Sequence, residues 1–535
     1  MRGVEMSNNG VAGQNPRGVS SEADSVRVIR GSGSAEGNTA ALRDVSQGKG
    51  LASGRIGLAT STVIGLSSTA PMYSLATTLG FVVVLVGVQA PVVFIAAFIP
   101  MLLTAFAYKE LSTAVPDSGT AFTWAVKAFT PKTGWLAGWG VVVAGVVVMA
   151  NQTEIAARYL WLLIGDGAGA QNMPLVTITG VSLIAVMTWV SLRNVESGNA
   201  TQWVLILIQY SAAELLVLAM IRAVVKGVDT GGVAFSWEWF NPLAAPSLDS
   251  FIQGVLMCLF IYWGWDTCLA MSEETKDPLK TPGRAAILSS ALLVTTYVGI
   301  TVVALMYAGA GSSGQGLANP EQIDDVFFAL KDSALGSIGW VVILAVAISA
   351  LATCQTTIIP TARGTFAMAV YKAVPARFGD VHPRHLTPSV ATIGIGVISA
   401  VYYVMMKLIS DSILEDTVAA TSVAVASYYC ITSFACIRYF KNQNRDTVRN
   451  FVFRLIFPLI GGTLMAVVLV YSLWSMLDPS YGETSLWGVS GVFVTVVVAL
   501  GLGLALMGWC ARRAELRPFF DGRSLNRSTE VRVPE

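Results

Sequence analysis

The stretch that decides the fold lies inside the first long apolar run of the chain and reads Gly65-Leu66-Ser67-Ser68-Thr69-Ala70-Pro71. Pro71 has no N–H, and its ring clashes with the carbonyl four residues earlier, so it weakens the helical turn that contains Ser67. Gly65 and the small hydroxyl residues make local unwinding easier. Because the sequence is apolar on both sides, we predict a membrane-crossing helix that is interrupted near its middle.

A second interruption is predicted five apolar runs later, in the stretch Phe260-Ile261-Tyr262-Trp263-Gly264-Trp265-Asp266. Gly264 is a poor helix former, and Asp266 is an acid in an otherwise apolar run. Unwound backbone at membrane depth survives only where it is buried in protein or lines a cavity. Two such helices in corresponding halves of a chain indicate a solute site near the midplane.

The interruptions leave N–H and C=O groups without helical partners, and these two kinds of group bind solute groups of opposite charge. Free N–H groups at the positive end of a helix suit a carboxylate. Free carbonyls at the negative end suit an ammonium group or a coupling cation. The pattern therefore favours an α-amino acid, which carries both groups, and it leaves a polyamine open.

The composition extends this interpretation to the whole chain. Of 535 residues, 54% are hydrophobic and only 13% are charged, whereas soluble domains carry about 25% charged residues. A helix needs about 20 residues to cross the hydrocarbon core, and a backbone in lipid must satisfy its own hydrogen bonds. We predict an all-α membrane protein with twelve transmembrane helices at residues 56–86, 91–111, 134–164, 173–192, 202–225, 251–270, 285–308, 337–370, 388–406, 416–437, 451–476 and 486–511.

The flanking segments predict the orientation. Residues 1–50 are rich in Gly, Ser and charged residues and contain no apolar run, which is typical of a disordered tail. Lys and Arg gather in the tails and in the even-numbered connections, as in the cluster Arg438 to Arg449. By the positive-inside rule, both termini face the cytoplasm, and the chain belongs in the plasma membrane.

Cysteine and histidine predict no metal chemistry. The six cysteines all lie in apolar runs without a CxxC spacing, and the two histidines, His382 and His385, share one short loop. The formal net charge is only +1. We therefore expect no metal, no cofactor and no nucleic-acid partner.

Three stretches together resemble the amino acid–polyamine–organocation superfamily of permeases over about residues 55–440. The first is Gly65 to Pro71. The second runs through Tyr108-Lys109-Glu110-Leu111-Ser112, Pro116-Asp117-Ser118-Gly119 and the tryptophans of Gly134-Trp135 and Gly138-Trp139. The third is Tyr262-Trp263-Gly264-Trp265-Asp266 followed by Glu273-Glu274-Thr275-Lys276-Asp277-Pro278 and Pro282-Gly283-Arg284.

The resemblance implies a five-plus-five inverted repeat, the LeuT-like arrangement, with two peripheral helices. Residues 51–440 would form the transporter core, residues 441–511 the peripheral helices, and residues 512–535 a cytoplasmic C-terminal tail. The small-molecule substrate would lie between the interrupted first and sixth helices, flanked by the third, eighth and tenth.

Site residues follow from the same resemblance. The first interruption would bind the carboxylate through Ser67, Ser68 and Thr69, and the second would bind the amine through Phe260, Tyr262 and Gly264. Trp263 or Trp265 would be an aromatic gate. Asn151, in the third helix, is a further candidate that can line the site.

Coupling is predicted less sharply. Many members carry a charged residue in the fifth helix, where this chain has Gln209; Glu214 follows five residues later and is a proton-site candidate unless it is simply solvated near the outer surface. Asp266 is a second proton-site candidate or a structural partner. In the eighth helix, Thr353 and Thr356 can ligate a cation or bond their own backbone. At the cytoplasmic ends of helices, we interpret three acids near basic residues as inner-gate or loop-ordering charges: Glu110, Glu273 and Glu274.

Several functional classes stay open at this point. The leading hypothesis is an importer of an amino acid or polyamine coupled to a proton or sodium ion, and an exchanger on the same fold is the alternative. A membrane-embedded enzyme would need clustered nucleophiles, metal ligands or acid–base pairs, and the sequence has neither HExxH nor GxSxG. A channel would need a selectivity motif, and none is evident.

Overall fold

The computed structural model describes residues 49–164, 167–193, 195–409, 413–482, 484–486 and 488–531. Within them, ten helical stretches are long and apolar enough to cross a membrane. The first of these, Pro71–Ala114, contains two helices, and two shorter apolar helices, Leu58–Ser67 and Leu248–Ile261, accompany the ten. The prediction of an all-α membrane protein is confirmed, and the count of twelve spans stays a prediction.

The elements divide into long and short helices. The long helices are α3 (Pro71–Val86), α4 (Ala90–Ala114), α6 (Pro131–Leu162), α7 (Met173–Leu192), α8 (Val195–Val225), α11 (Thr281–Ala308), α13 (Trp340–Val370), α14 (Ser389–Ile409), α15 (Ile413–Tyr439), α17 (Phe457–Ser475) and α18 (Gly491–Arg512). The short helices are α2 (Leu58–Ser67), α5 (Ala121–Ala128), α9 (Leu248–Ile261), α10 (Thr267–Ala270), α12 (Val326–Leu335), α16 (Val448–Phe451) and α19 (Arg517–Phe520). A small antiparallel hairpin of β1 (Ser485–Leu486) and β2 (Val489–Ser490) precedes α18.

Local sequence explains where several helices begin. Thr130, Asn172 and Ser247 each accept a hydrogen bond from a backbone N–H in the first turn of α6, α7 and α9, respectively. Such caps satisfy donors that have no partner inside the helix. Proline stands in the first turn of α3, α4, α6 and α7, where its missing N–H costs nothing.

The helix contacts agree with an inverted repeat. A twofold operation that relates the first five spans to the next five would superimpose α4 on α11, α6 on α13, and α7 on α14. The two members of each of these pairs also pack against each other. Mixed contacts also occur in matching pairs. The packing of α9 on α4 matches that of α2 on α11, and the packing of α8 on α13 matches that of α15 on α6.

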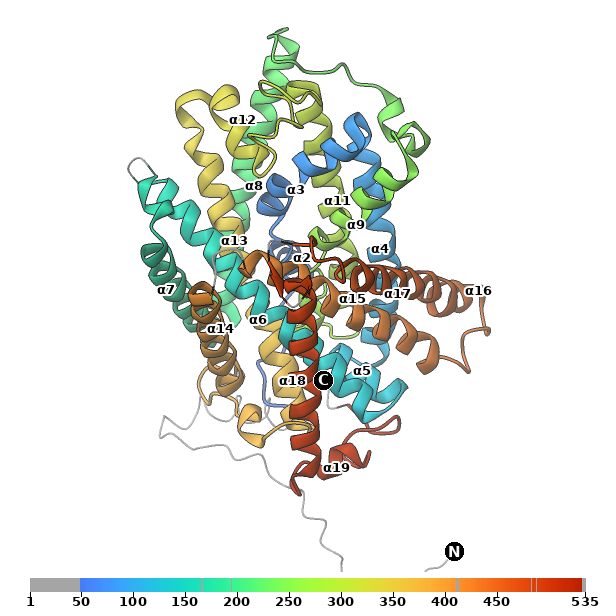
Figure 1. Cartoon of the computed structure of the whole chain (residues 1–535). Coiled ribbons are helices and arrows are strands. Elements are labelled where there is room, and N and C mark those ends of the chain that lie inside the picture. The colour runs from blue at the N-terminus through green and yellow to red at the C-terminus, as the bar shows by residue number, and fades with distance from the viewer. Residues whose placement is uncertain are drawn as a thin grey trace, which may run out of the picture.

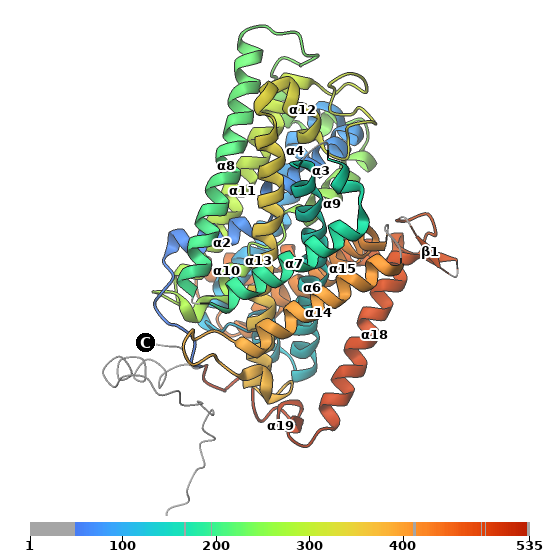
Figure 2. The same ribbon diagram turned by 90° about the vertical axis from the view of Figure 1, so that its left-hand side faces the viewer.

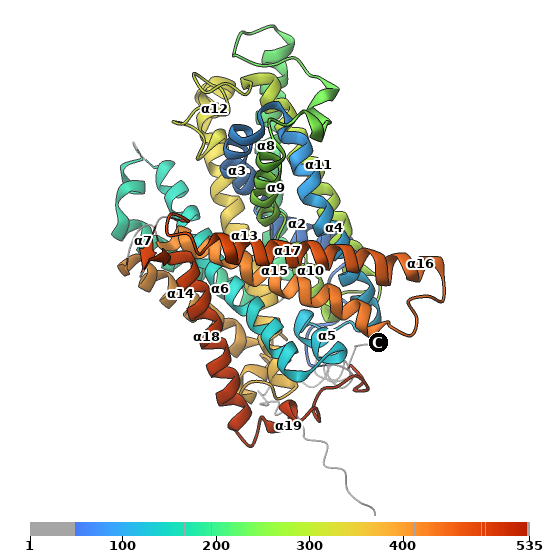
Figure 3. The same ribbon diagram turned by 45° about the vertical axis from the view of Figure 1, so that its right-hand side comes forward.

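The views separate the two ends and the flanks of the bundle. Helix α12 lies at one end, and α5 and α19 lie at the other (Figure 1). Helices α7 and α14 pack together on one flank, which faces the viewer in Figure 2. Helices α15 and α17 run side by side across the bundle in Figure 3.

Parts of both predicted tails are packed against the bundle where the structure describes them. Residues 1–48 lie outside the described residues, but Lys49, which the sequence assigns to the disordered tail, is buried. At the other terminus, Phe519 is fully buried, and its ring stacks on Phe122 of α5 at a centroid distance of 5.6 Å. The C-terminal segment therefore packs under the bundle as far as Leu525, which is also buried in this cluster.

Candidate functional site

The first interruption lies where the sequence predicts it. Helix α2 ends at Ser67 and α3 begins at Pro71. Between them, Ala70 adopts a left-handed conformation with φ 46°, which is unfavourable for a residue with a Cβ atom. The N–H groups in the first turn of α3, including that of Met72, have no partner within the helix and lie at its positive end.

The second interruption separates α9 from α10. Helix α9 ends at Ile261, α10 begins at Thr267, and Gly264 between them has φ +117°. L-residues with side chains rarely adopt this conformation, so the break depends on glycine. Among the described residues, no hydrogen bond ends on the carbonyl oxygens of Tyr262 and Trp263.

The two interruptions contact each other. A Cβ atom added at Gly264 would lie 2.5 Å from the carbonyl oxygen of Ser68, so the backbones approach as closely as glycine allows. The hydroxyl oxygens of Ser68 and Thr267 are 2.8 Å apart and share a hydrogen bond. Residues from opposite halves of the chain therefore meet at one buried point.

Helix α13 forms a further wall. Thr353 donates its hydroxyl proton to the carbonyl of Ser67, 2.8 Å away, and so caps one peptide group freed by the first break. Thr356 instead bonds its own backbone at Ala352, 3.1 Å away. Thr353 is thus the one of the two predicted hydroxyls that reaches the break.

Several buried polar atoms near this wall have no partner among the described residues. They include the hydroxyls of Ser67 and Ser349 and both amide atoms of Gln209, which is fully buried. Gln202 of α8 bonds Gln355 of α13 at 2.8 Å. The two helices run in opposite directions. Gln209 lies two turns after Gln202 on α8, and it is therefore at the level of Ser349, which lies nearly two turns before Gln355 on α13. Unpaired buried polar atoms of this kind are costly, and a bound solute, ion or water would satisfy them.

The aromatic residues of the second break point in different directions. Tyr262 donates its hydroxyl to the carbonyl of Phe94 at 3.0 Å, so only its backbone is available to a substrate. Trp265 is buried between Tyr108 and Tyr429, at centroid distances of 5.2 and 5.5 Å. Its ring is part of a packed cluster, and its indole N–H has no partner among the described residues.

Asp266 and Trp263 connect this break to α15. The Asp266 carboxylate accepts a hydrogen bond from the hydroxyl of Tyr429 at 3.0 Å. Trp263 donates its indole N–H to the hydroxyl of Tyr428 and stacks on Phe260 at 6.1 Å with an interplanar angle of 15°.

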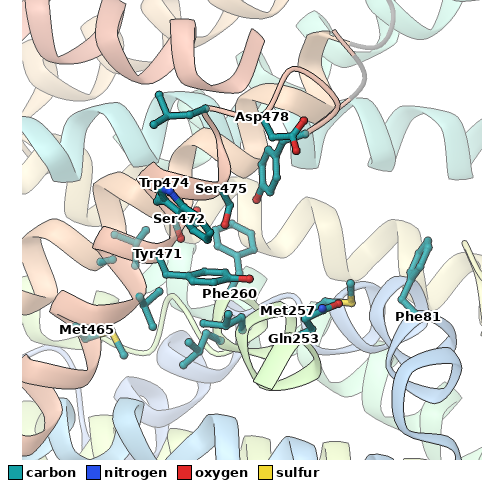
Figure 4. A pocket seen from close by; sticks show the side chains of 18 of the residues that line it. Phe81, Gln253, Met257, Phe260, Met465, Tyr471, Ser472, Trp474, Ser475 and Asp478 are labelled. Carbon is teal, nitrogen blue, oxygen red and sulfur yellow. The ribbon is translucent and has the colours of Figure 1, made fainter. Parts of the chain in front are cut away.

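Phe260 lies at the edge of a cavity of about 1420 Å³ between α9, α15 and α17. Figure 4 shows the side chains of Phe260, Tyr471 and Trp474 gathered around it, with Asp478 on the loop after α17. Asp478 is the charged side chain in the lining. Hydrogen bonds from the hydroxyl and N–H of Ser480 lower the pKa of this exposed carboxyl, so it stays ionised.

For three of the candidate site residues predicted from the sequence, the structure gives no hydrogen bond to either helix break. Glu214 is exposed on α8, so it is not buried among the helices, and its role stays a prediction. Glu110 pairs with Arg449 and Arg454, the latter at 2.7 Å, and fastens α4 to the segment before α17. Asn151 is half-buried on α6, and its side chain forms no hydrogen bond to either break among the described residues.

The chain matches the amino acid permease family over residues 56–507. It belongs to this family. This confirms the resemblance seen in the sequence and the prediction of a membrane transporter for amino acids or related amines, and it sets aside the membrane-embedded enzyme. The match includes both interrupted helices and the peripheral spans.

The relatives of this permease share low sequence identity with it, but the matches extend over most of each chain. The low-affinity putrescine importer of Escherichia coli K12 is 24% identical over 440 residues, covering 82% of this chain and 91% of that protein. The human large neutral amino acids transporter small subunit 2 is 24% identical over 69% of this chain and 66% of its own. The branched-chain amino acid permease of Bacillus subtilis is 21% identical over 65% of this chain and 73% of its own.

One end of the permease bundle is fastened by a buried ionic network. The ammonium of Lys49 lies 2.6 Å from Asp117 and 2.7 Å from Glu273, and all three side chains are almost fully buried. Asp117 also accepts a hydrogen bond from the hydroxyl of Tyr371 at 2.6 Å. These residues precede α2 or follow α4, α10 and α13, so the network joins four chain segments at one end.

The charges in the network stabilise one another unequally. Burial favours the neutral form of Lys49, but the negative charges of Asp117 and Glu273 outweigh it and raise the pKa of the ammonium. Burial would raise the pKa of Asp117, yet the Lys49 charge lowers it below its ordinary value. Burial raises the pKa of Glu273, and Lys49 offsets this only in part. One cation is thus shared by two carboxylates.

A second buried pair reinforces the same end. Arg363 of α13 makes two hydrogen bonds to Glu274, at 2.6 and 2.7 Å. The backbone N–H groups of Arg55 and Ile56 both donate to the Glu274 carbonyl, at 2.9 and 3.0 Å. These bonds join the segment before α2 to the segment after α10, and the inner-gate or loop-ordering role of Glu273 and Glu274 stays a prediction.

The opposite end is covered by the connection between α11 and α13. A Cβ atom added at Gly80 of α3 would lie 2.6 Å from the carbonyl of Ile323, so this loop sits directly on α3. Tyr159 of α6 donates its hydroxyl to Asp325, the residue that caps α12.

Sequence reasoning missed Lys49 and Asp117 as partners. Asp117 belongs to the Pro116-Asp117-Ser118-Gly119 stretch, which carried the family resemblance but no assigned role. Lys49 stands at the border of the predicted tail, seven residues before the first apolar run, and no local pattern in the sequence marks it as a partner of Asp117.

Proposed function

We propose that this permease carries an amino acid or a related amine across the plasma membrane by alternating access, with the solute bound between the breaks of the first and sixth spans. The observation that carries the proposal is the close contact of Gly264 with Ser68, which places two unwound segments from opposite halves of the chain at one buried point.

The peptide groups at this point are suited to both ends of such a solute. The N-terminus of α3 offers N–H groups near Ser67, Ser68 and Thr69 for a carboxylate. The free carbonyls of Tyr262 and Trp263 suit an ammonium group. The hydroxyl of Ser68, now bonded to Thr267, can exchange that bond for one to the solute.

The approach from the outer side favours solutes that contain an amine. The cavity beside Phe260 combines aromatic faces with the ionised Asp478, and aromatic faces attract ammonium groups. Asp266, at the second break, adds a carboxylate close to the site. These features support an amino acid or a polyamine over an acid without an amine.

The Lys49 network supports an inner gate in its closed state. It joins the ends of the first, second, sixth and eighth spans. Basic residues are concentrated in the connections at this end, so we assign this end and both termini to the cytoplasm. Opening toward the cytoplasm would require the ammonium to leave both carboxylates.

The test is the substitution Gly264→Ala, compared with Gly299→Ala. A methyl group at Gly264 would clash with Ser68 and disfavour φ +117°, whereas Gly299 on α11 has open space around it. Uptake of radiolabelled leucine and putrescine into proteoliposomes should fall by at least about tenfold in the first variant and stay near wild type in the second. Normal uptake by a folded Gly264→Ala protein would refute the site.

Coupling to a proton or sodium ion is our proposal for the driving force, with exchange as the alternative. The unpaired amide of Gln209 and the hydroxyl of Ser349 suit a cation held by neutral oxygen ligands, and Asp266 suits a proton. Uptake into vesicles with no internal solute should depend on an imposed pH or sodium gradient. Uptake that ignores both gradients and requires internal solute would support exchange instead.

A further inference from the structure

A second cavity, of about 420 Å³, lies where α7 ends and α14 begins, away from the breaks. Its walls include Trp189 and Arg193 at the end of α7, His382 and Arg384 in the loop before α14, and Ile393 in the first turns of α14. The transport mechanism proposed above uses none of these residues.

The walls of this cavity are held in place by local hydrogen bonds. Thr387 donates its hydroxyl to the carbonyl of Leu192 at 2.9 Å, which fixes the loop against the end of α7. His382 accepts the N–H groups of Arg384 and His385 on its Nδ1 atom, both at 3.2 Å. In the neutral ring the proton is therefore on Nε2, which can donate to a ligand.

The positive charge of the cavity is not neutralised by the part of the chain that the structure describes. Neither Arg193 nor Arg384 forms an ion pair with a described carboxylate. Glu196, the acid that follows Arg193 most closely, pairs with Arg55 at 2.9 Å. Burial and the charges of neighbouring basic groups, including Arg384 and Arg193, lower the pKa of His385, as an uncompensated positive field would.

The outer rim of the cavity is apolar and faces away from the protein. Trp189 is 53% exposed and Ile393 is 47% exposed, although both lie on helices that are apolar enough to span a membrane. The guanidinium of Arg193 lies 4.1 Å from the centre of the Trp189 ring. Tryptophan and arginine at a helix end mark the boundary between lipid and water.

An apolar strip continues from this rim toward the membrane interior. On α7, Val186 precedes Trp189 by three residues and is about half exposed. On α14, Val397 and Val401 follow Ile393 at intervals of four residues and are also about half exposed. Side chains with this spacing share one helix face. The basic cavity therefore opens onto a surface that acyl chains can cover.

We propose that this cavity is a binding site for the phosphate headgroup of an anionic phospholipid, with Arg193 and Arg384 contacting the phosphate and the α7–α14 strip contacting the acyl chains. Arginine pairs with phosphate through two parallel hydrogen bonds, and the start of α14 adds the positive end of a helix. Basic pockets between spans on the cytoplasmic side are suited to such headgroups. A free phosphate would use the same cations but not the apolar strip.

The experiment compares lipid binding by the full-length protein and two double variants. Arg193→Gln with Arg384→Gln removes both cations of the site, and Arg377→Gln with Arg445→Gln removes two exposed cations outside it. Native mass spectrometry with phosphatidylglycerol and with phosphatidylcholine measures the bound fraction of each lipid. Size-exclusion chromatography confirms that each variant is folded.

We expect wild type and the Arg377/Arg445 variant to prefer phosphatidylglycerol, and the Arg193/Arg384 variant to bind it about tenfold more weakly. Equal affinity for phosphatidylglycerol in the two double variants would overturn the site. Inorganic phosphate should not compete at a concentration similar to that of the lipid, and efficient competition would show a phosphate site without lipid specificity. The readout is independent of transport, so this proposal and the proposed function can fail separately.

Discussion

At the residue scale, the proposed inner gate depends on Lys49. It is the cation shared by Asp117 and Glu273, and its side chain is 1% exposed. Without it, two carboxylates would remain buried within reach of each other. The residue that links these segments therefore lies outside every candidate membrane span.

The substitution Lys49→Met should open this end. Breaking a buried ion pair by removing one partner costs about 3–5 kcal/mol, and here the loss falls on the closed state. Hydrogen exchange in residues 58–67, which form α2, should become faster. Lys280→Met is the matched control because Lys280 pairs with Asp277 at 3.7 Å on the exposed surface. Equal protection of α2 in wild type and Lys49→Met would contradict the gate.

Individual residues also show how far sequence reasoning reaches. Pro71 and Gly264 act on their own backbone, so both breaks could be predicted from local chemistry. The partners of Lys49, Asp117 and Asp266 come from distant segments, and no local pattern encodes them. For the same reason, exposed Glu214 and the inward amide of Gln209 could be told apart only once α8 was packed.

At the element scale, α12 couples the outer loop to the core. Asp325 caps this helix by accepting the N–H of Phe328 at 2.9 Å, and it accepts a hydrogen bond from Tyr159 of α6. Helices α5 and α12 were absent from the sequence prediction because each is shorter than the roughly 20 residues that identify a span. For the long helices, most of the predicted ends lie within a few residues of the observed ends, because the length of an apolar run alone defines such a helix.

The pKa of Asp325 makes the seating of this loop dependent on pH. Burial raises the pKa of the Asp325 carboxyl, and the nearby Asp324 charge adds to the rise, while hydrogen bonds from Tyr159 and the backbone oppose it. The seated loop therefore binds this proton more tightly than a released loop would. Its extra stability is fully present below the ordinary pKa and is lost as the pH rises through the raised value.

Acidifying the outer medium from about pH 7 to about pH 4.5 should thus raise the protection factors of residues 309–336, that is, slow their hydrogen exchange relative to the intrinsic rate at each pH. Asp325→Asn, which resembles the neutral acid, should keep the loop seated and remove this pH dependence. Asp332→Asn, on the exposed side of α12, is the control and should keep the wild-type response. Lower protection factors at low pH in the wild type would show that the sign is wrong.

At the scale of the whole molecule, the two halves of the permease meet where their helices are broken. Contacts between α4 and α11, α6 and α13, and α7 and α14 relate the halves to each other. Ser68 and Thr267 come from the first and the second half, and they share a hydrogen bond at the centre. This arrangement could be predicted only from the family resemblance, because apolar runs locate the spans along the chain but not their order in space.

The most direct measurement is transport by a Ser68→Cys, Thr267→Cys protein in which Cys268 is replaced by alanine. The two hydroxyl oxygens are 2.8 Å apart, so the new thiols can form a disulfide across the breaks. Uptake of radiolabelled leucine or putrescine, whichever the wild type carries, should stop on oxidation and return on reduction. Undiminished uptake by protein shown by mass spectrometry to be fully crosslinked would contradict a solute site that opens and closes between the two breaks.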